Sequence, residues 1–294
     1  MALWQRERVT LVIESETVRL VGVMKGRVTR WGSAPLPPGT LDSQGAVGAP
    51  AQLAQVLERL WASQALGTPA PRDRVVLAIP GRHIASRFIP AAGAETLDAS
   101  GLATRAREAL PRADAYHAWQ VIGASSRRAI FVVAAPTPLV DGYVAVLARA
   151  GLGVAAIDLK PLALIRGVGQ RHAIIVDAER FLATIIIVDD ALPRQVRFQP
   201  LDASLLAAPE EKIMRIAEVV HNTIQRYNEE AATVLHPAVP VFLTGSLAEH
   251  PLLRAAVQEV LRHTVGKLSP SLVTPPDMPL SQFLANLGLA QKQL

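Results

Sequence analysis

The stretch AIIVDAERFLATIIIVDDALPRQVRF spans residues 173–198 of the 294-residue chain. It contains three runs rich in Val, Ile and Phe, separated by short polar turns, and this pattern predicts three strands joined by tight turns. A similar strand–turn–strand pattern, VTLVIESETVRLVGV, lies near the start of the chain at residues 9–23. Because both halves begin alike, we expect a duplicated architecture of two related domains.

Helical periodicity follows each of these strand-rich segments. Apolar residues recur at helical spacing in 50–64 and 209–230. Further helices are predicted at 99–109, 139–149, 161–168, 250–262 and 281–289. Short strands are predicted between them at 75–79, 86–89, 118–122, 129–134, 154–159 and 239–243. Strands that alternate with helices along the whole chain indicate an α/β fold.

The composition excludes several classes of protein. Hydrophobic residues make up 50% of the chain and charged residues 19%, which excludes intrinsic disorder. The absence of cysteine excludes a disulfide scaffold, a thiolate metal site and a cysteine nucleophile. The net charge is +5, but the arginines are scattered and only 4% of residues are aromatic, so we expect no nucleic-acid partner.

Membrane and export signals are also missing from the sequence. No window reaches the roughly 18 uninterrupted apolar residues that a membrane span requires. The first residues carry a charge at Arg6 and lack the apolar segment of a signal peptide. We therefore expect a soluble, cytoplasmic protein.

The sequence lacks the motifs of common enzyme classes. None of the seven histidines lies three or four residues from another, so no metal site is predicted. Gly-x-Ser-x-Gly, the Walker A motif and Gly-x-Gly-x-x-Gly are all absent. Asp158 and Asp177 each end a predicted buried strand, where ligands gather in open α/β sheets, and are the better candidates for a site. We assign no catalytic residue.

Several segments, taken in order, resemble the PilM family of type IV pilus assembly proteins, which are cytoplasmic and have the actin-like (ribonuclease H-like) fold. The resemblance extends over about 280 residues, and each segment alone is a weak signal. The segments are VVLAIPG at 75–81, RFIP at 87–90, FVVAAP at 131–136, AIDLKPLA at 156–163 and FLANLGLA at 283–290.

The resemblance implies a division into two actin-like domains, at residues 1–172 and 173–294. It implies a small inserted subdomain in the first domain, at about 75–155. It also implies that the clamp subdomain of the second domain is reduced to one helix, at about 206–232. The reason is that few residues separate Phe198 from the helix that starts at Pro209.

The family's role supplies the expected partners. PilM proteins bind the short cytoplasmic N-terminal peptide of PilN, a protein that crosses the membrane once, and form a scaffold beneath the pilus machine. The resemblance therefore implies a PilN-like peptide and other pilus platform proteins as partners, and a peripheral location at the inner face of the cytoplasmic membrane. Whether the chain forms homo-oligomers stays open.

The peptide groove is expected between the first domain and its insert. The residues predicted to lie near it are Pro80, Arg87, Leu110, Pro111 and Tyr116. Because the chain has few aromatic residues, we expect aliphatic side chains and arginine to provide most of the binding energy.

The loops that hold nucleotide phosphates in the family are altered in this chain. The first family loop reads roughly Asp/Glu-Ile-Gly, and here it is Val12-Ile13-Glu14; the second reads Asp-Ile-Gly, and here it is Asp177-Ala178-Glu179. A carboxylate at each glycine position would face the phosphates. Two like charges about 4 Å apart cost on the order of 4 kcal/mol at a surface-like dielectric. The family's triple-glycine adenosine loop is here Thr244-Gly245-Ser246.

We therefore expect a degenerate nucleotide pocket, with Asp177 and Gly245 as its remnants, no ATP or Mg²⁺ cofactor and no enzymatic activity. Two alternatives stay open. One is an enzyme whose altered loops still bind Mg·ATP, with Asp177 holding a metal-bound water: an actin-like ATPase in which nucleotide controls partner binding, or a small-molecule kinase. The other is the cytoplasmic actin-like domain of a type II secretion platform.

Overall fold

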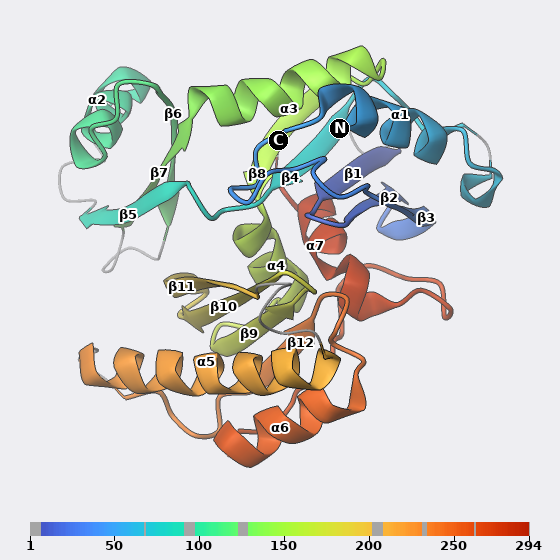
Figure 1. The fold of residues 1–294 in the computed structure, drawn as a ribbon. Coiled ribbons are helices and arrows are strands. Elements are labelled where there is room, and N and C mark those ends of the chain that lie inside the picture. Colours follow the sequence, from blue (N-terminus) through green and yellow to red (C-terminus); the bar gives the residue numbers. More distant parts are fainter. Residues whose placement is uncertain are drawn as a thin grey trace.

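A computed structural model describes residues 7–67, 69–90, 98–122, 129–201, 208–230, 234–261 and 263–293. The chain forms two lobes, each built on a β-sheet, with two helices between them and a small third sheet at one side (Figure 1). Among the described residues, no helix combines the length and the apolar character needed to cross a membrane.

The first lobe contains a five-stranded sheet with the order β3-β2-β1-β4-β8. β1, β2 and β3 form an antiparallel meander, whereas β4 and β8 run parallel to β1. The strands are β1 (Arg8–Ile13), β2 (Thr17–Met24), β3 (Arg27–Pro35), β4 (Val75–Ile79) and β8 (Val154–Leu159).

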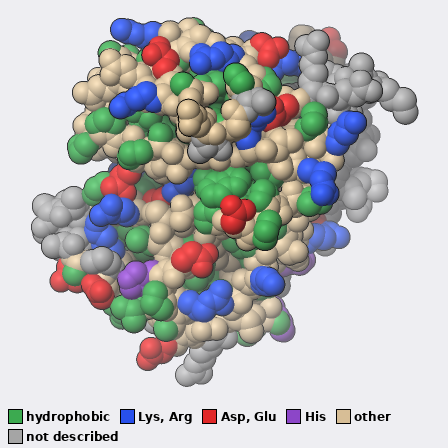
Figure 2. Space-filling view, turned by 90° about the vertical axis from the view of Figure 1, so that its right-hand side faces the viewer, with side chains coloured by type: hydrophobic (Ala, Val, Ile, Leu, Met, Phe, Trp, Pro, Cys, Tyr) green, Lys and Arg blue, Asp and Glu red, His purple; other side chains and the backbone are tan. Residues whose placement is uncertain are grey.

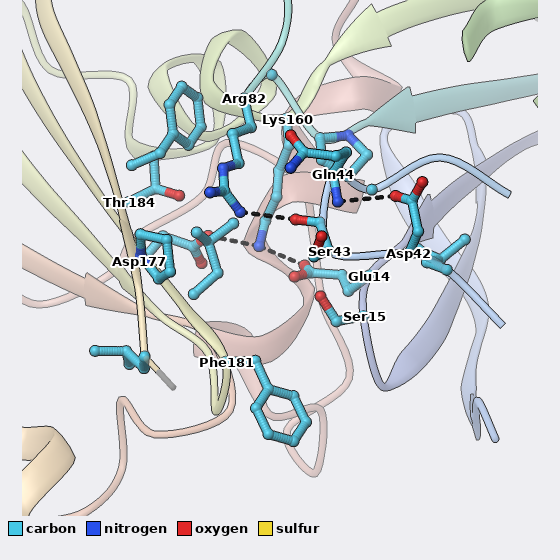
Figure 3. Close-up of a pocket in the computed structure, with 18 of the residues that line it drawn as sticks. Glu14, Ser15, Asp42, Ser43, Gln44, Arg82, Lys160, Asp177, Phe181 and Thr184 are labelled. Atoms are coloured by element: carbon cyan, nitrogen blue, oxygen red, sulfur yellow. Dashed lines mark hydrogen bonds and ion pairs between the residues drawn. The ribbon is translucent and has the colours of Figure 1, made fainter. Parts of the chain in front are cut away.

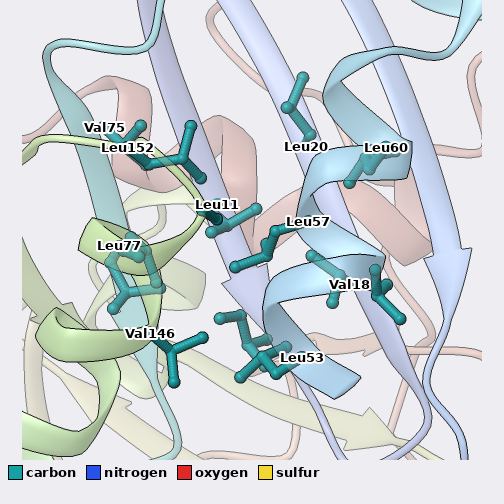
Figure 4. Close-up of a cluster of buried hydrophobic side chains, with 14 of the residues drawn as sticks. Leu11, Val18, Leu20, Leu53, Leu57, Leu60, Val75, Leu77, Val146 and Leu152 are labelled. Carbon is teal, nitrogen blue, oxygen red and sulfur yellow. The ribbon is translucent and has the colours of Figure 1, made fainter. Parts of the chain in front are cut away.

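Helices α1 (Pro50–Trp61) and α3 (Thr137–Arg149) belong to the core of this lobe. The apolar residues of α1 recur at helical spacing, so that Leu53 and Leu57 point from one face of the helix onto Leu11 and its neighbours in the sheet (Figure 4). A short 3₁₀ helix, η1 (Gln64–Leu66), follows α1.

The second lobe repeats the topology of the first. Its sheet has the order β11-β10-β9-β12, with β9 to β11 antiparallel and β12 parallel to β9. The strands are β9 (Ala173–Ala178), β10 (Leu182–Asp189), β11 (Leu192–Pro200) and β12 (Val241–Thr244). α5 (Pro209–Glu230) and α6 (Pro251–Leu261) cover the outer face (Figure 1). The similarity between the two halves of the sequence is therefore a similarity of topology.

The third sheet has the order β5-β7-β6 and is covered on one face by α2. Its elements are β5 (Ala85–Pro90), α2 (Ala99–Ala109), β6 (Ala115–Ile122) and β7 (Ala129–Pro136). The insert was predicted at about 75–155, but β4 and β8 pair with each other in the five-stranded sheet. The separate sheet is therefore confined to the segment from Ala85 to Pro136.

Two helices, α4 (Lys160–Val168) and α7 (Leu280–Ala290), lie between the lobes and pack closely on each other (Figure 1). A Cβ atom on Gly288 would collide with the carbonyl group of Ala163, and one on Gly167 would lie 2.7 Å from the carbonyl oxygen of Leu284. Glycine is therefore required on both sides of this crossing. The α4–α7 pair shares one buried apolar cluster with strands of both lobes.

Two further details bear on the sequence predictions. β3 was not predicted, because its sequence RVTRWGSAP does not alternate regularly between apolar and polar residues as a half-buried strand does. α5 begins nine residues after Pro200, the last residue of β11. Residues 206, 207, 231 and 232 of the range predicted for the clamp helix lie outside the described residues.

Charged side chains of both signs are dispersed over one face of the molecule (Figure 2). Figure 2 shows Lys and Arg interspersed with Asp and Glu on one face of the molecule. This distribution is typical of a solvated surface rather than of a continuous basic patch.

Candidate functional site

Two equivalent hairpin turns meet in the cleft between the lobes. The N–H of Glu14, directly after β1, donates to the carbonyl oxygen of Thr17 at 2.9 Å. The N–H of Glu179, directly after β9, donates in the same way to Leu182 at 3.0 Å. The two glutamates therefore occupy the same position in the two related hairpins, and their carboxylates approach each other across the cleft.

Two buried cations bridge these carboxylates. Arg19 on β2 donates from Nη1 to Glu14 at 3.0 Å and to Glu179 at 2.8 Å, and from Nη2 to Glu179 at 3.2 Å. Lys160, the first residue of α4, forms ion pairs with Glu14 and with Asp177 at 2.5 Å (Figure 3). It also forms an ion pair with Glu179 at 3.5 Å. All five side chains are at most 12% exposed. We call these five residues the charge cluster.

The loop Thr244-Gly245-Ser246, which begins at the last residue of β12, contacts the same cluster. The N–H of Ser246 donates to Oε2 of Glu179 at 3.1 Å. Gly245 has a φ of +93°, and a Cβ atom there would lie 2.5 Å from the carbonyl oxygen of Ala178. The close approach of this loop to the end of β9 therefore requires glycine at position 245.

The environment shifts the pKa values of the three acids in different directions. Burial, reinforced by the nearby Glu179, raises the pKa of Glu14 to about 7. Burial also raises the pKa of Asp177, although Lys160 opposes this shift. Burial alone would raise the pKa of Glu179 as well, but Lys160 and Arg19 outweigh it and hold that pKa at about 2. When Glu14 is protonated, the two remaining carboxylates balance the two cations.

The cluster also has the geometry of a cation site. Glu14, Asp177 and Glu179 each offer an oxygen atom, and these atoms lie within 4.8 Å of one another. The ammonium group of Lys160 forms ion pairs with all three carboxylates. This lysine therefore supplies the positive charge that a metal ion would bring.

Two cavities flank the charge cluster, and Glu14, Ser15 and Phe181 line both of them. The larger has a volume of about 500 Å³ and is lined partly by Arg82 and Thr184 (Figure 3). The smaller, of about 330 Å³, lies on the side of Arg19 and Ser246. The cleft thus has open space on both sides of a filled centre.

A third cavity, of about 210 Å³, lies between the insert and the β8 edge of the five-stranded sheet. We call it the groove. The chain has four Trp, three Tyr and six Phe, and one of each kind, Trp119, Tyr116 and Phe131, lines this groove. Tyr116 is 51% exposed, and its hydroxyl group donates to Asp141 at 2.9 Å.

The predicted groove residues lie in different places. Tyr116 lines the groove, whereas Pro80 lines the larger cavity of the cleft. Arg87 donates to the carbonyl oxygen of Ala109 at 3.3 Å. Leu110 packs against the buried cluster beneath α2, and Pro111 is exposed.

Of the predicted nucleotide remnants, Asp177 belongs to the charge cluster. Gly245 directly precedes Ser246, whose N–H donates to Glu179 of the cluster. Sequence reasoning missed Arg19 and Lys160. Each carried a signal, because Arg19 is a single charge inside an apolar strand and Lys160 stands at a helix N-terminus, where the helix dipole disfavours a cation.

Comparisons with known proteins bear on the fold. No protein-family model matches the sequence, and no curated protein does. A chain of the PilM–PilN type IV pilus biogenesis complex superimposes with a TM-score of 0.75, covering 98% of both chains at 19% identity. The chain has the actin-like fold.

Two further solved structures share this fold. The ethanolamine utilization protein EutJ from Carboxydothermus hydrogenoformans matches with a TM-score of 0.61 at 15% identity, covering 99% of this chain and 91% of EutJ. A Bacteroides thetaiotaomicron protein with an actin-like ATPase fold and unknown function matches with a TM-score of 0.51 at 9% identity, covering 99% and 97% of the two chains. The fold expected from the PilM resemblance is confirmed.

Proposed function

We propose that this chain is a non-catalytic, PilM-like scaffold of a type IV pilus assembly platform. It binds the cytoplasmic N-terminal peptide of a PilN-like membrane protein and does not turn over nucleotide. The observation that carries the proposal is the charge cluster, in which the hairpins of the actin-like fold hold each other instead of phosphate groups.

The cluster argues against nucleotide binding on two grounds. Phosphate sites in proteins supply backbone N–H groups and cations that are free to bind an anion. In the described cleft, Arg19 and Lys160 are engaged by carboxylates, and the N–H of Ser246 is engaged by Glu179. A phosphate group would have to displace these pairs and lie against three acids, so the residues do not fit Mg·ATP.

The groove supports the partner assignment. Among the structures similar to this chain is a chain of a PilM–PilN complex. The superposition covers nearly the whole of this chain and of the chain that it matches. The groove of this chain has an apolar lining, an exposed aromatic ring and a location between the lobe and its insert. These properties suit a short apolar peptide. In this proposal the chain reaches the inner face of the cytoplasmic membrane through its partner and meets other platform proteins there.

One experiment tests both parts of this proposal. The fluorescent N-terminal peptide of the organism's own PilN-like protein is titrated with the purified chain, with and without 1 mM Mg·ATP. At this concentration even a weak nucleotide site, with a binding free energy of about −4 kcal/mol, would be half occupied. We expect saturable binding with the same Kd in both conditions. A nucleotide-dependent Kd would favour the gated ATPase, and no binding of the peptide would contradict the scaffold.

A further inference from the structure

The edge of a β-sheet borders the groove. β8 is the last strand of the five-stranded sheet, and its only strand partner within the described segments is β4. Ile157, Asp158 and Leu159 of β8 line the groove. The outer side of β8 therefore borders the groove without a neighbouring strand, and the main-chain N–H of Leu159 donates to the Asp158 carboxylate at 2.8 Å.

The opposite wall is one face of the insert sheet. Along β7, Ile130, Val132 and Ala134 are buried against the insert core, so the alternate positions point the other way. Phe131, Val133 and Ala135 line the groove, together with the exposed Tyr116 and Ala118 of β6. This face of β6 and β7 is apolar and only partly buried.

The two walls of the groove favour different chemical groups in a bound molecule. The apolar face favours any apolar group, whether from a lipid, a small molecule or a side chain. The edge of β8 presents donors and acceptors at the regular repeat of a strand, and another extended main chain matches that repeat. Only an extended polypeptide satisfies both walls.

We infer that the partner segment binds as an added β-strand along β8, with its main chain paired to β8 and alternate apolar side chains against the β6–β7 face. This inference rests on the proposed function and adds the mode of recognition to it. The occupant is an extended, predominantly apolar peptide without proline at the paired positions, because proline has no N–H to donate.

Tyr116 provides an oriented aromatic ring against which the bound peptide can pack. Its hydroxyl group donates to Asp141 on α3, so the ring is held at the edge of the groove before a partner binds. An oriented aromatic ring loses little conformational freedom on binding, which favours affinity.

The test is a scan of backbone N-methylation in the same PilN-like peptide, with the protein left unchanged. Each N-methyl group removes one main-chain donor and keeps every side chain. We expect the Kd to rise about tenfold at every second position, where the N–H points to β8, and much less at the positions between them.

Two protein variants locate the binding site. Ala118→Arg introduces a long charged side chain into the groove, whereas Ala145→Arg places the same side chain on the exposed surface of α3, outside the groove lining. We expect Ala118→Arg to abolish binding and Ala145→Arg to leave it unchanged.

The outcomes separate the inference from the function on which it rests. Binding that Ala118→Arg abolishes, but that shows no alternation in the N-methyl scan, overturns strand addition and leaves the scaffold function intact. Equal effects of the two arginine variants overturn the groove as the binding site. Failure of the unmodified peptide to bind the wild-type chain contradicts the scaffold function as well.

Discussion

The cleft and the groove are built on opposite principles. In the cleft, five buried charged side chains bind one another across the two lobes. In the groove, no described strand pairs with the outer edge of β8, and the face of the insert sheet opposite it is mostly apolar. The difference teaches that a fold can keep the hairpins of its central site while the chain itself fills that site. On our proposal, binding then depends on the groove.

The largest effect is expected from removing the cation at the centre of the cluster. Lys160→Met keeps an unbranched side chain one atom shorter than lysine but leaves three buried carboxylates with one arginine, and unpairing buried charges costs about 3–5 kcal/mol. Urea unfolding measures the loss. The control is Arg215→Met, which breaks an exposed pair with Glu218 and costs about 0–1 kcal/mol. Equal losses in the two variants would show that the cluster contributes no special stability.

The pH dependence of stability provides the next test. Because the pKa of Glu14 is raised from its ordinary value of 4.5 to about 7 in the folded chain, the folded state binds this proton more tightly. Its contribution to stability therefore falls as pH rises from 5 to 7, by about 2 kcal/mol. Unfolding of wild type and Glu14→Gln across this window measures the difference between them. Parallel pH profiles would contradict the shifted pKa.

A smaller effect is expected at the entrance of the groove. Tyr116→Ala removes the half-exposed ring and should weaken the binding of the PilN-like peptide roughly fivefold. Tyr116→Phe keeps the ring, loses only the hydrogen bond to Asp141, and should change the Kd less. Val144→Ala is the control, since Val144 is exposed on α3 and does not line the groove. Equal Kd values for all three variants would remove Tyr116 from the binding site.

The sequence was a good guide wherever local patterns determine structure. α5 and α2 have the predicted bounds, and the two hairpins lie where β-branched runs flank short polar turns. Glu14 and Glu179 were expected to obstruct phosphate binding, and they do lie at equivalent positions in the cleft.

The pairing of these acids was not predictable from local patterns. Arg19 and Glu179 are 160 residues apart, and only the docking of the two lobes brings them together. The groove illustrates the same limit. Composition predicts that aliphatic side chains and arginine provide most of the binding energy, and it gives no sign that the pairing of β6 with β7 places Tyr116 and Phe131 on the same face of the insert sheet. Total aromatic content says nothing about where those few residues meet.

The central claim is that the charge cluster closes the cleft to nucleotide. Calorimetric titration of the wild-type chain with Mg·ATP and with Mg·ADP, up to about 1 mM ligand, tests this claim most directly. Even a weak site, with a binding free energy of about −4 kcal/mol, would give a measurable heat of binding at that concentration. The account predicts no binding of either nucleotide. Saturable binding with a micromolar Kd would contradict it, because the three acids at Glu14, Asp177 and Glu179 would then have to give way to phosphate.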